Sequence, residues 1–130
     1  MVADNKSRIL VADDDKDILD LVTFVLTHSG YEVVGVSDGS AAFAAIKSEQ
    51  PKLAILDVMM PGMSGIDVLK RVRENEANKN LTIILFSVVT DESVVAAGLA
   101  AGASEYIKKP VNLRELLNIV SSFLARSDHG

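Results

Sequence analysis

Short apolar runs alternate with longer stretches of helical periodicity along the chain, and this alternation restricts the possible folds more than any other feature. The short runs have the length and the β-branched content of buried strands. They are Ile9–Ala12, Tyr31–Val36, Leu53–Leu56, Thr82–Phe86 and Tyr106–Ile107. A stretch with apolar residues at helical spacing follows each run, which gives five successive βα units. The pattern predicts an α/β fold, a (βα)5 doubly wound parallel sheet with helices on both faces.

The first and last helical stretches carry the clearest apolar stripes. In the first, the residues that share one helix face are Ile18, Leu21, Val22, Val25 and Leu26. In the last, they are Leu113, Leu116, Leu117, Val120, Phe123 and Leu124. We therefore expect each of these helices to bury one stripe against the sheet.

Composition and charge argue against several classes of protein. The net charge is −5 and the 13 Lys and Arg residues are scattered, so we expect no direct nucleic-acid contact. No apolar run approaches the roughly 18 residues that a membrane helix needs, so we expect no membrane insertion. The absence of cysteine suits a reducing compartment, and we expect a cytoplasmic protein.

Polar side chains directly follow four of the five predicted strands. Because the carboxyl ends of parallel strands meet at one edge of the sheet, we expect these side chains to converge there. Each alone has an ordinary explanation, such as a loop acid or a surface lysine, but their joint placement does not. They are Asp13 and Asp14 after the first strand, Asp57 after the third, Ser87 after the fourth, and Lys108 and Lys109 after the fifth.

The chemistry of this cluster favours phosphoryl transfer. Neighbouring carboxylates repel one another unless a cation neutralises them, and an all-oxygen set of ligands suits Mg²⁺. Phosphoryl transfer needs an in-line nucleophile and positive charge around the phosphoryl oxygens. Asp57 can be the nucleophile. Lys109 and the cation can supply the charge, and Ser87 can donate a hydrogen bond.

Three segments resemble the signature segments of response-regulator receiver domains, the phosphoacceptor modules of two-component systems, and are similar to those of chemotaxis regulators. They are Ile9–Asp15, Leu56–Gly65 and Gly102–Pro110. The resemblance extends from about Arg8 to Leu124 and implies a single receiver domain over residues 1–130, with its core at about 8–124. It also implies the flavodoxin-like strand order 2-1-3-4-5, which a member of this family illustrates.

The resemblance assigns the metal and acceptor roles residue by residue. Asp57 resembles the phosphoacceptor. Asp14 and Asp57 resemble direct ligands of Mg²⁺, or alternatively Mn²⁺, together with the backbone carbonyl of Met59. Asp13 would act through a water molecule. Asp15 is expected to be an acid of the first helical turn, where negative charge is favourable, and not a third ligand.

The remaining roles concern the fourth and fifth strands. Ser87 resembles the switch hydroxyl, and Tyr106 resembles the aromatic residue that changes rotamer with it. Lys109 resembles the cation that pairs with the phosphoryl group, and Lys108 is expected at the surface, because side chains alternate along a strand and Pro110 sets the register of the motif. The family also implies a cis peptide bond between Lys109 and Pro110.

The implied function is that of a signalling switch and not of an enzyme with an external substrate. A sensor histidine kinase, a phosphotransfer protein or a small phosphodonor would supply the phosphoryl group. A downstream protein target or a fused output domain would read the surface of the fourth helix, the fifth strand and the last helix. The fourth helix, about Asp91–Ala101, carries no charge from Val94 onward, so we expect some of its small apolar residues to face water.

Three other functions remain to be distinguished. A haloacid-dehalogenase-like phosphatase needs a second Asp two residues after the nucleophile, where this chain has Met59. A nucleotide-binding module needs a Gly- or Ser/Thr-rich loop after the first strand, where three aspartates stand. A pseudo-receiver that only binds partners would be expected to lack Asp57, Asp14 or Lys109. Labelling by acetyl phosphate in the presence of Mg²⁺ separates these functions.

Overall fold

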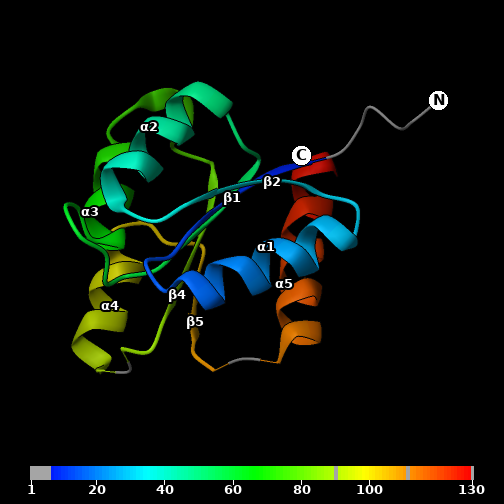
Figure 1. Ribbon diagram of the computed structural model, residues 1–130. Coiled ribbons are helices and arrows are strands. Elements are labelled where there is room, and N and C mark those ends of the chain that lie inside the picture. The colour runs from blue at the N-terminus through cyan, green and yellow to red at the C-terminus, as the bar shows by residue number, and fades with distance from the viewer. Residues whose placement is uncertain (1–6, 90, 111, 130) are drawn as a thin grey trace.

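Five parallel strands form one sheet in the order β2-β1-β3-β4-β5 in the computed structural model, which describes residues 7–89, 91–110 and 112–129 (Figure 1). This order confirms the predicted fold class and strand order. The observed strands agree with the predicted runs to within one residue at each end. They are β1 (Arg8–Ala12), β2 (Glu32–Val36), β3 (Leu53–Leu56), β4 (Thr82–Ser87) and β5 (Glu105–Lys108).

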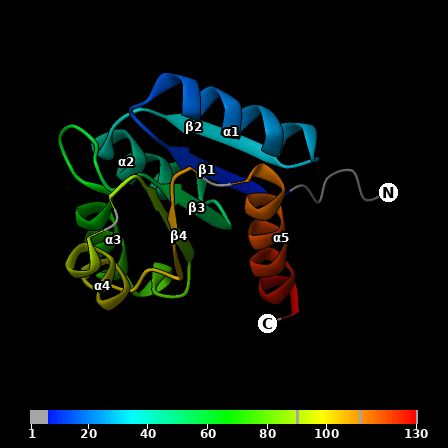
Figure 2. The same ribbon diagram turned by 90° about the horizontal axis from the view of Figure 1, so that it is seen from below.

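Helices cover both faces of this sheet. Buried residues of α1 and α5 form one core cluster with the sheet, and those of α2 and α3 form the other, against which α4 also packs. Figure 2 shows α2, α3 and α4 together, apart from α1 and α5. None of the helices in the described segments is long and apolar enough to cross a membrane. Their bounds are α1 (Lys16–His28), α2 (Gly39–Glu49), α3 (Gly65–Arg73), α4 (Glu92–Ala100) and α5 (Leu113–His129), with a short 3-10 turn at Glu76–Asn78.

Strand side chains alternate between the two core clusters, as the two-residue period requires. On β4, Ile84 and Phe86 pack toward α1 and α5, whereas Ile83 and Leu85 pack toward α2 and α3. The same alternation holds in β1 and β3. The alternation continues into the residue after each strand and sets the side of the sheet on which its side chain lies. It therefore decides which polar side chains meet at the carboxyl edge of the sheet.

The predicted stripe of α1 is buried only in part. Val22 and Leu26 are buried against the sheet, but Leu21 is 49% exposed. Asp15 is the N-cap of this helix, and its carboxylate accepts hydrogen bonds from the backbone N–H groups of Asp17 and Ile18 at 3.0 and 3.3 Å. This contact satisfies helix-end donors, so Asp15 caps the helix, one position before the first helical turn in which we expected it.

The uncharged face of α4 is turned to solvent as expected. Ala96, Ala97 and Leu99 are exposed, whereas Gly98 is buried. A Cβ atom at Gly98 would lie only 2.6 Å from Cδ1 of Leu85, which is itself completely buried. Glycine therefore permits the close approach of α4 to β4.

Candidate functional site

Three of the predicted site residues come together because they extend the same face of three strands of one sheet. Asp13 follows Val11, Asp57 follows Ile55 and Lys109 follows Ile107, each two positions after a side chain in the α1–α5 core cluster. β1 lies beside β3, and β4 separates β3 from β5. The carboxyl edge of the sheet therefore gathers two acids and one base that are up to 96 residues apart in sequence.

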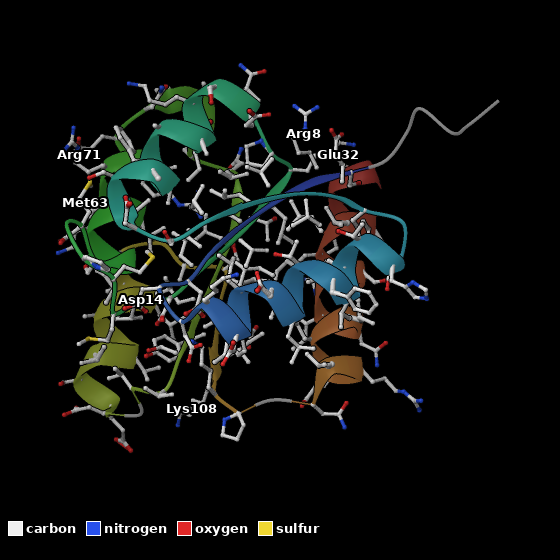
Figure 3. All side chains as sticks on the ribbon, in the orientation of Figure 1. Arg8, Asp14, Glu32, Met63, Arg71 and Lys108 are labelled. Carbon is white, nitrogen blue, oxygen red and sulfur yellow. The ribbon has the colours of Figure 1, made fainter. Side chains whose placement is uncertain are left out.

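The ammonium group of Lys109 lies between two buried carboxylates. Its Nζ donates to Oδ2 of Asp13 at 2.6 Å and to Oδ2 of Asp57 at 3.3 Å. The three side chains are almost completely buried, at 6%, 3% and 7% exposure for Lys109, Asp13 and Asp57. Lys108 is exposed, and Figure 3 shows it at the end of β5, pointing away from the body of the molecule. Alternation thus places Lys109, and not Lys108, against the acids.

The two N-terminal acids have different surroundings. Both oxygens of Asp13 are engaged, because Oδ1 accepts the backbone N–H of Asp15 at 2.9 Å and Oδ2 accepts Lys109. Asp14 is exposed at the turn between β1 and α1 (Figure 3). One carboxylate oxygen from each of Asp13, Asp14 and Asp57 lies within 4.8 Å of the others. This all-oxygen set could hold a hard divalent cation, which prefers oxygen ligands.

The loop after β3 folds tightly against Asp57. The backbone N–H of Met59 donates to Oδ1 of Asp57 at 3.2 Å, and the N–H of Gly65 donates to the carbonyl of Val58 at 3.0 Å. A Cβ atom at Gly65 would overlap the carbonyl oxygen of Asp57. The site therefore requires glycine at position 65, and this requirement could not be seen in the sequence.

Burial and charge shift the pKa values of the site in a consistent way. Burial raises the pKa of Asp57 above its ordinary value of 3.8, and the charge of Asp13 adds to the rise, while Lys109 offsets only part of it. Burial alone lowers the pKa of Lys109, but its hydrogen bond to Asp13 and the charges of both acids outweigh burial and raise it. The metal-free site therefore holds Lys109 charged and disfavours the ionised form of Asp57.

We expect Asp57→Asn to raise the melting temperature in the presence of a chelator, by roughly 2–5 °C near neutral pH. The raised pKa means that the folded protein binds this proton more tightly than the unfolded chain does, so ionisation of Asp57 costs stability as pH rises. The gain should shrink as pH falls through the raised pKa of Asp57 and should vanish below 3.8, where the carboxyl is protonated in both the folded and the unfolded state. Thermal melts over this range test it, with the exposed Asp20→Asn as control. A lower melting temperature of the Asp57 variant at neutral pH would contradict the sign.

Ser87 and Tyr106 form a second group on the other face of β4 and β5. Ser87 is completely buried, and its Oγ accepts the backbone N–H of Val89 at 3.2 Å. The hydroxyl of Tyr106 donates to the carbonyl of Val89 at 2.7 Å, and burial raises the pKa of this phenol. The backbone N–H of Lys109 donates to the carbonyl of Ser87 at 2.8 Å. The end of β4 thus connects the acid cluster to Tyr106.

Sequence reasoning missed an aromatic residue at the site. The ring of Phe86 lies below the ammonium of Lys109, with Nζ 5.1 Å from its centroid. Phe86 also lines an apolar pocket of about 400 Å³, next to the 65% exposed Val88. No sequence pattern indicated this contact, because it depends on the register between β4 and β5, in which Phe86 pairs with Ile107 and Lys109 lies two residues further on the same face. The bond between Lys109 and Pro110 is cis, as expected.

Comparison with known proteins gives a consistent result. The family model described as the response regulator receiver domain matches residues 9–121. The DNA-binding response regulator MtrA of Mycobacterium tuberculosis is 38% identical over 123 residues, which are 95% of this chain and 53% of that protein. The regulatory protein PhoP of Bacillus subtilis is 36% identical, over 93% of this chain and 50% of its own length. The chain thus spans about half the length of these curated relatives.

Solved structures of similar proteins share the fold over almost their whole length. A putative response regulator from Chloroflexus aurantiacus superposes with a TM-score of 0.86 at 35% identity, covering 92% of this chain and 98% of its own. A CheY-like receiver domain protein from Methanospirillum hungatei gives 0.87 at 32% identity, with 96% and 99% covered. The BeF3-activated receiver domain of DrrB gives 0.84 at 32% identity, with 92% and 98% covered.

Proposed function

Since the chain belongs to the response regulator receiver domain family, we propose that it is a phosphoacceptor signalling switch that carries the phosphoryl group on Asp57. The observation that carries this proposal is the buried carboxylate of Asp57 at the carboxyl edge of the sheet, 3.3 Å from Lys109 and beside two further acids. A nucleophile next to a fixed positive charge is what phosphoryl transfer demands of a protein.

The proposed reaction moves one phosphoryl group between two side chains. A carboxylate oxygen of Asp57 attacks the phosphorus of a phosphohistidine on a sensor histidine kinase or phosphotransfer protein. A P–O bond forms and the P–N bond breaks, and its electron pair returns to the imidazole nitrogen of the donor. A small acyl phosphate can replace the phosphohistidine. Lys109 then pairs with the phosphoryl oxygens, and the protein acts on no substrate other than itself.

The acid cluster is the proposed site of Mg²⁺, with Mn²⁺ as an alternative. Asp14 and Asp57 would hold the ion together with the backbone carbonyl of Met59, and Asp13 would act through a water molecule. The exposed position of Asp14 and the full engagement of both Asp13 oxygens support this division of roles. The ion supplies positive charge to the acids and to the transferred phosphoryl oxygens.

The proposed output is a change of the surface formed by α4, β5 and α5. Ser87 would reach for the phosphoryl group as the switch hydroxyl, and Tyr106 would change rotamer with it. The contact of both residues with Val89 supports a coupled movement. A downstream protein or a fused output domain would read this surface in the cytoplasm.

Incubation with acetyl phosphate and Mg²⁺ tests the proposal. We expect intact-mass spectrometry to find one added phosphoryl group, and chelation of the metal to abolish the labelling. Continuous release of inorganic phosphate over many turnovers would instead indicate a phosphatase. A protein that neither gains a phosphoryl group nor releases phosphate would be a pseudo-receiver.

A further inference from the structure

Phe86 contacts Lys109 at the proposed acceptor site and takes no part in the proposed phosphoryl transfer. The residue is 5% exposed, and the centroid of its ring lies 5.1 Å from Nζ of Lys109. The contact follows from the sheet, since Phe86 pairs with Ile107 and the side chain of Lys109 extends the same face. An ammonium within about 6 Å of an aromatic centroid is attracted by the ring quadrupole, more strongly where water is excluded.

We propose that Phe86 is a positioning residue for Lys109, which holds the ammonium where it meets the phosphoryl group; this inference rests on the proposed function of Asp57. A lysine has a long and flexible stem, and fixing it costs conformational entropy. The ammonium of Lys109 lies over the face of the ring, so the protein already holds this ammonium at the acid site before phosphorylation. Donors that are fixed before the reaction stabilise the transition state without reorganising.

The ring does something that the acids cannot do. Asp13 and Asp57 also hold Lys109, at 2.6 and 3.3 Å. In the proposed reaction, however, both carboxylates take a new partner, which is the cation or the phosphoryl group. An uncharged aromatic face binds no metal and forms no covalent bond here. Phe86 can therefore keep Lys109 in place after the two acids have changed their charge or partners.

The competing explanation is packing alone. Phe86 belongs to the core cluster that the sheet forms with α1 and α5, so its ring also fills space in the same core as Ile107 and Leu116. A side chain that only fills space should be replaceable by another apolar side chain, and its effect should not depend on Lys109. These two consequences separate packing from positioning.

The experiment compares Phe86→Leu and Phe86→Tyr with the unchanged protein at saturating Mg²⁺. The readouts are the rate constant of labelling by acetyl phosphate and the affinity for beryllofluoride. We expect Phe86→Leu to lower both about tenfold, as the loss of a desolvated cation–π contact implies. Phe86→Tyr keeps the ring and should stay within about twofold. Phe86→Met replaces the Leu variant if that variant does not fold by circular dichroism.

A double-mutant cycle and a second phenylalanine complete the test. In a Lys109→Met background, Phe86→Leu should have no further effect on beryllofluoride affinity. Phe43→Leu is the matched control, because Phe43 also contacts cations, Lys47 and Arg71 at 5.1 and 4.8 Å, but on α2 and away from the site. It should leave both readouts unchanged.

The outcomes separate this inference from the proposed function. Equal values for Phe86→Leu and the unchanged protein, or an equal loss with and without Lys109, would overturn the positioning role alone. Failure of the unchanged protein to become labelled would overturn the proposed function together with the role of Phe86 in it.

Discussion

Replacing Asp57 by asparagine should lower labelling by acetyl phosphate at least about a hundredfold, to the level of the background. The amide is a poor nucleophile and carries no negative charge, so neither the attack on phosphorus nor metal binding is supported. Asparagine has nearly the same shape, and its side-chain oxygen can still accept the backbone N–H of Met59, which donates to Asp57 Oδ1 at 3.2 Å. The variant should therefore fold normally.

Intact-mass and peptide spectrometry measure this effect and locate the phosphate. Asp20→Asn is the matched control, since Asp20 is an exposed acid on α1 whose contact is with Lys16, outside the acid cluster. It should be labelled at the normal rate. Phosphate on another residue of the unchanged protein would contradict the assignment of Asp57, and labelling of the Asp57 variant at that other residue would identify the true acceptor.

Replacing Lys109 by methionine should lower the free energy of unfolding in the presence of a chelator by about 3 kcal/mol. The change leaves the carboxylates of Asp13 and Asp57, whose side chains are 3% and 7% exposed, without their shared countercharge. Removal of one partner of a buried ion pair is costly because the remaining charge is poorly solvated. Added Mg²⁺ should restore much of the lost free energy of unfolding. The ion should also bind the variant more tightly than the unchanged protein, because a competing positive charge is gone.

Urea denaturation with and without Mg²⁺ checks both parts of this expectation. Lys108→Met is the control, because Lys108 is exposed and directly adjacent in sequence. It should change the free energy of unfolding by less than about 0.5 kcal/mol. A Lys109 variant that is as stable as the Lys108 variant in chelator would show that the acids are already neutral. This result would contradict the ion pairs of Lys109 with Asp13 and Asp57.

Much of the architecture was predictable because it depends on periodicities that the sequence displays directly. The β-branched apolar runs identify buried strands, and helical spacing identifies the elements between them. A parallel βαβ order then brings Asp57, Asp14 and Lys109 to one edge of the sheet, whatever the details of packing. The choice of Lys109 over Lys108 also follows from strand alternation, and the burial of Lys109 agrees with it.

Only the tertiary structure decided how these residues contact one another. The sequence predicts which strand end and which face a side chain occupies, but not how far apart two strand ends lie. The hydrogen bond between Lys109 and Asp13 joins residues 96 positions apart and depends on the spacing of four strands. Gly98 could be read as a weak point of a helix, whereas in the fold its missing side chain lets α4 approach Leu85. Phe86 could be read as one more core residue, whereas the pairing of β4 with β5 places its ring below Lys109. Such contacts arise from the packing of distant elements, which no local periodicity encodes.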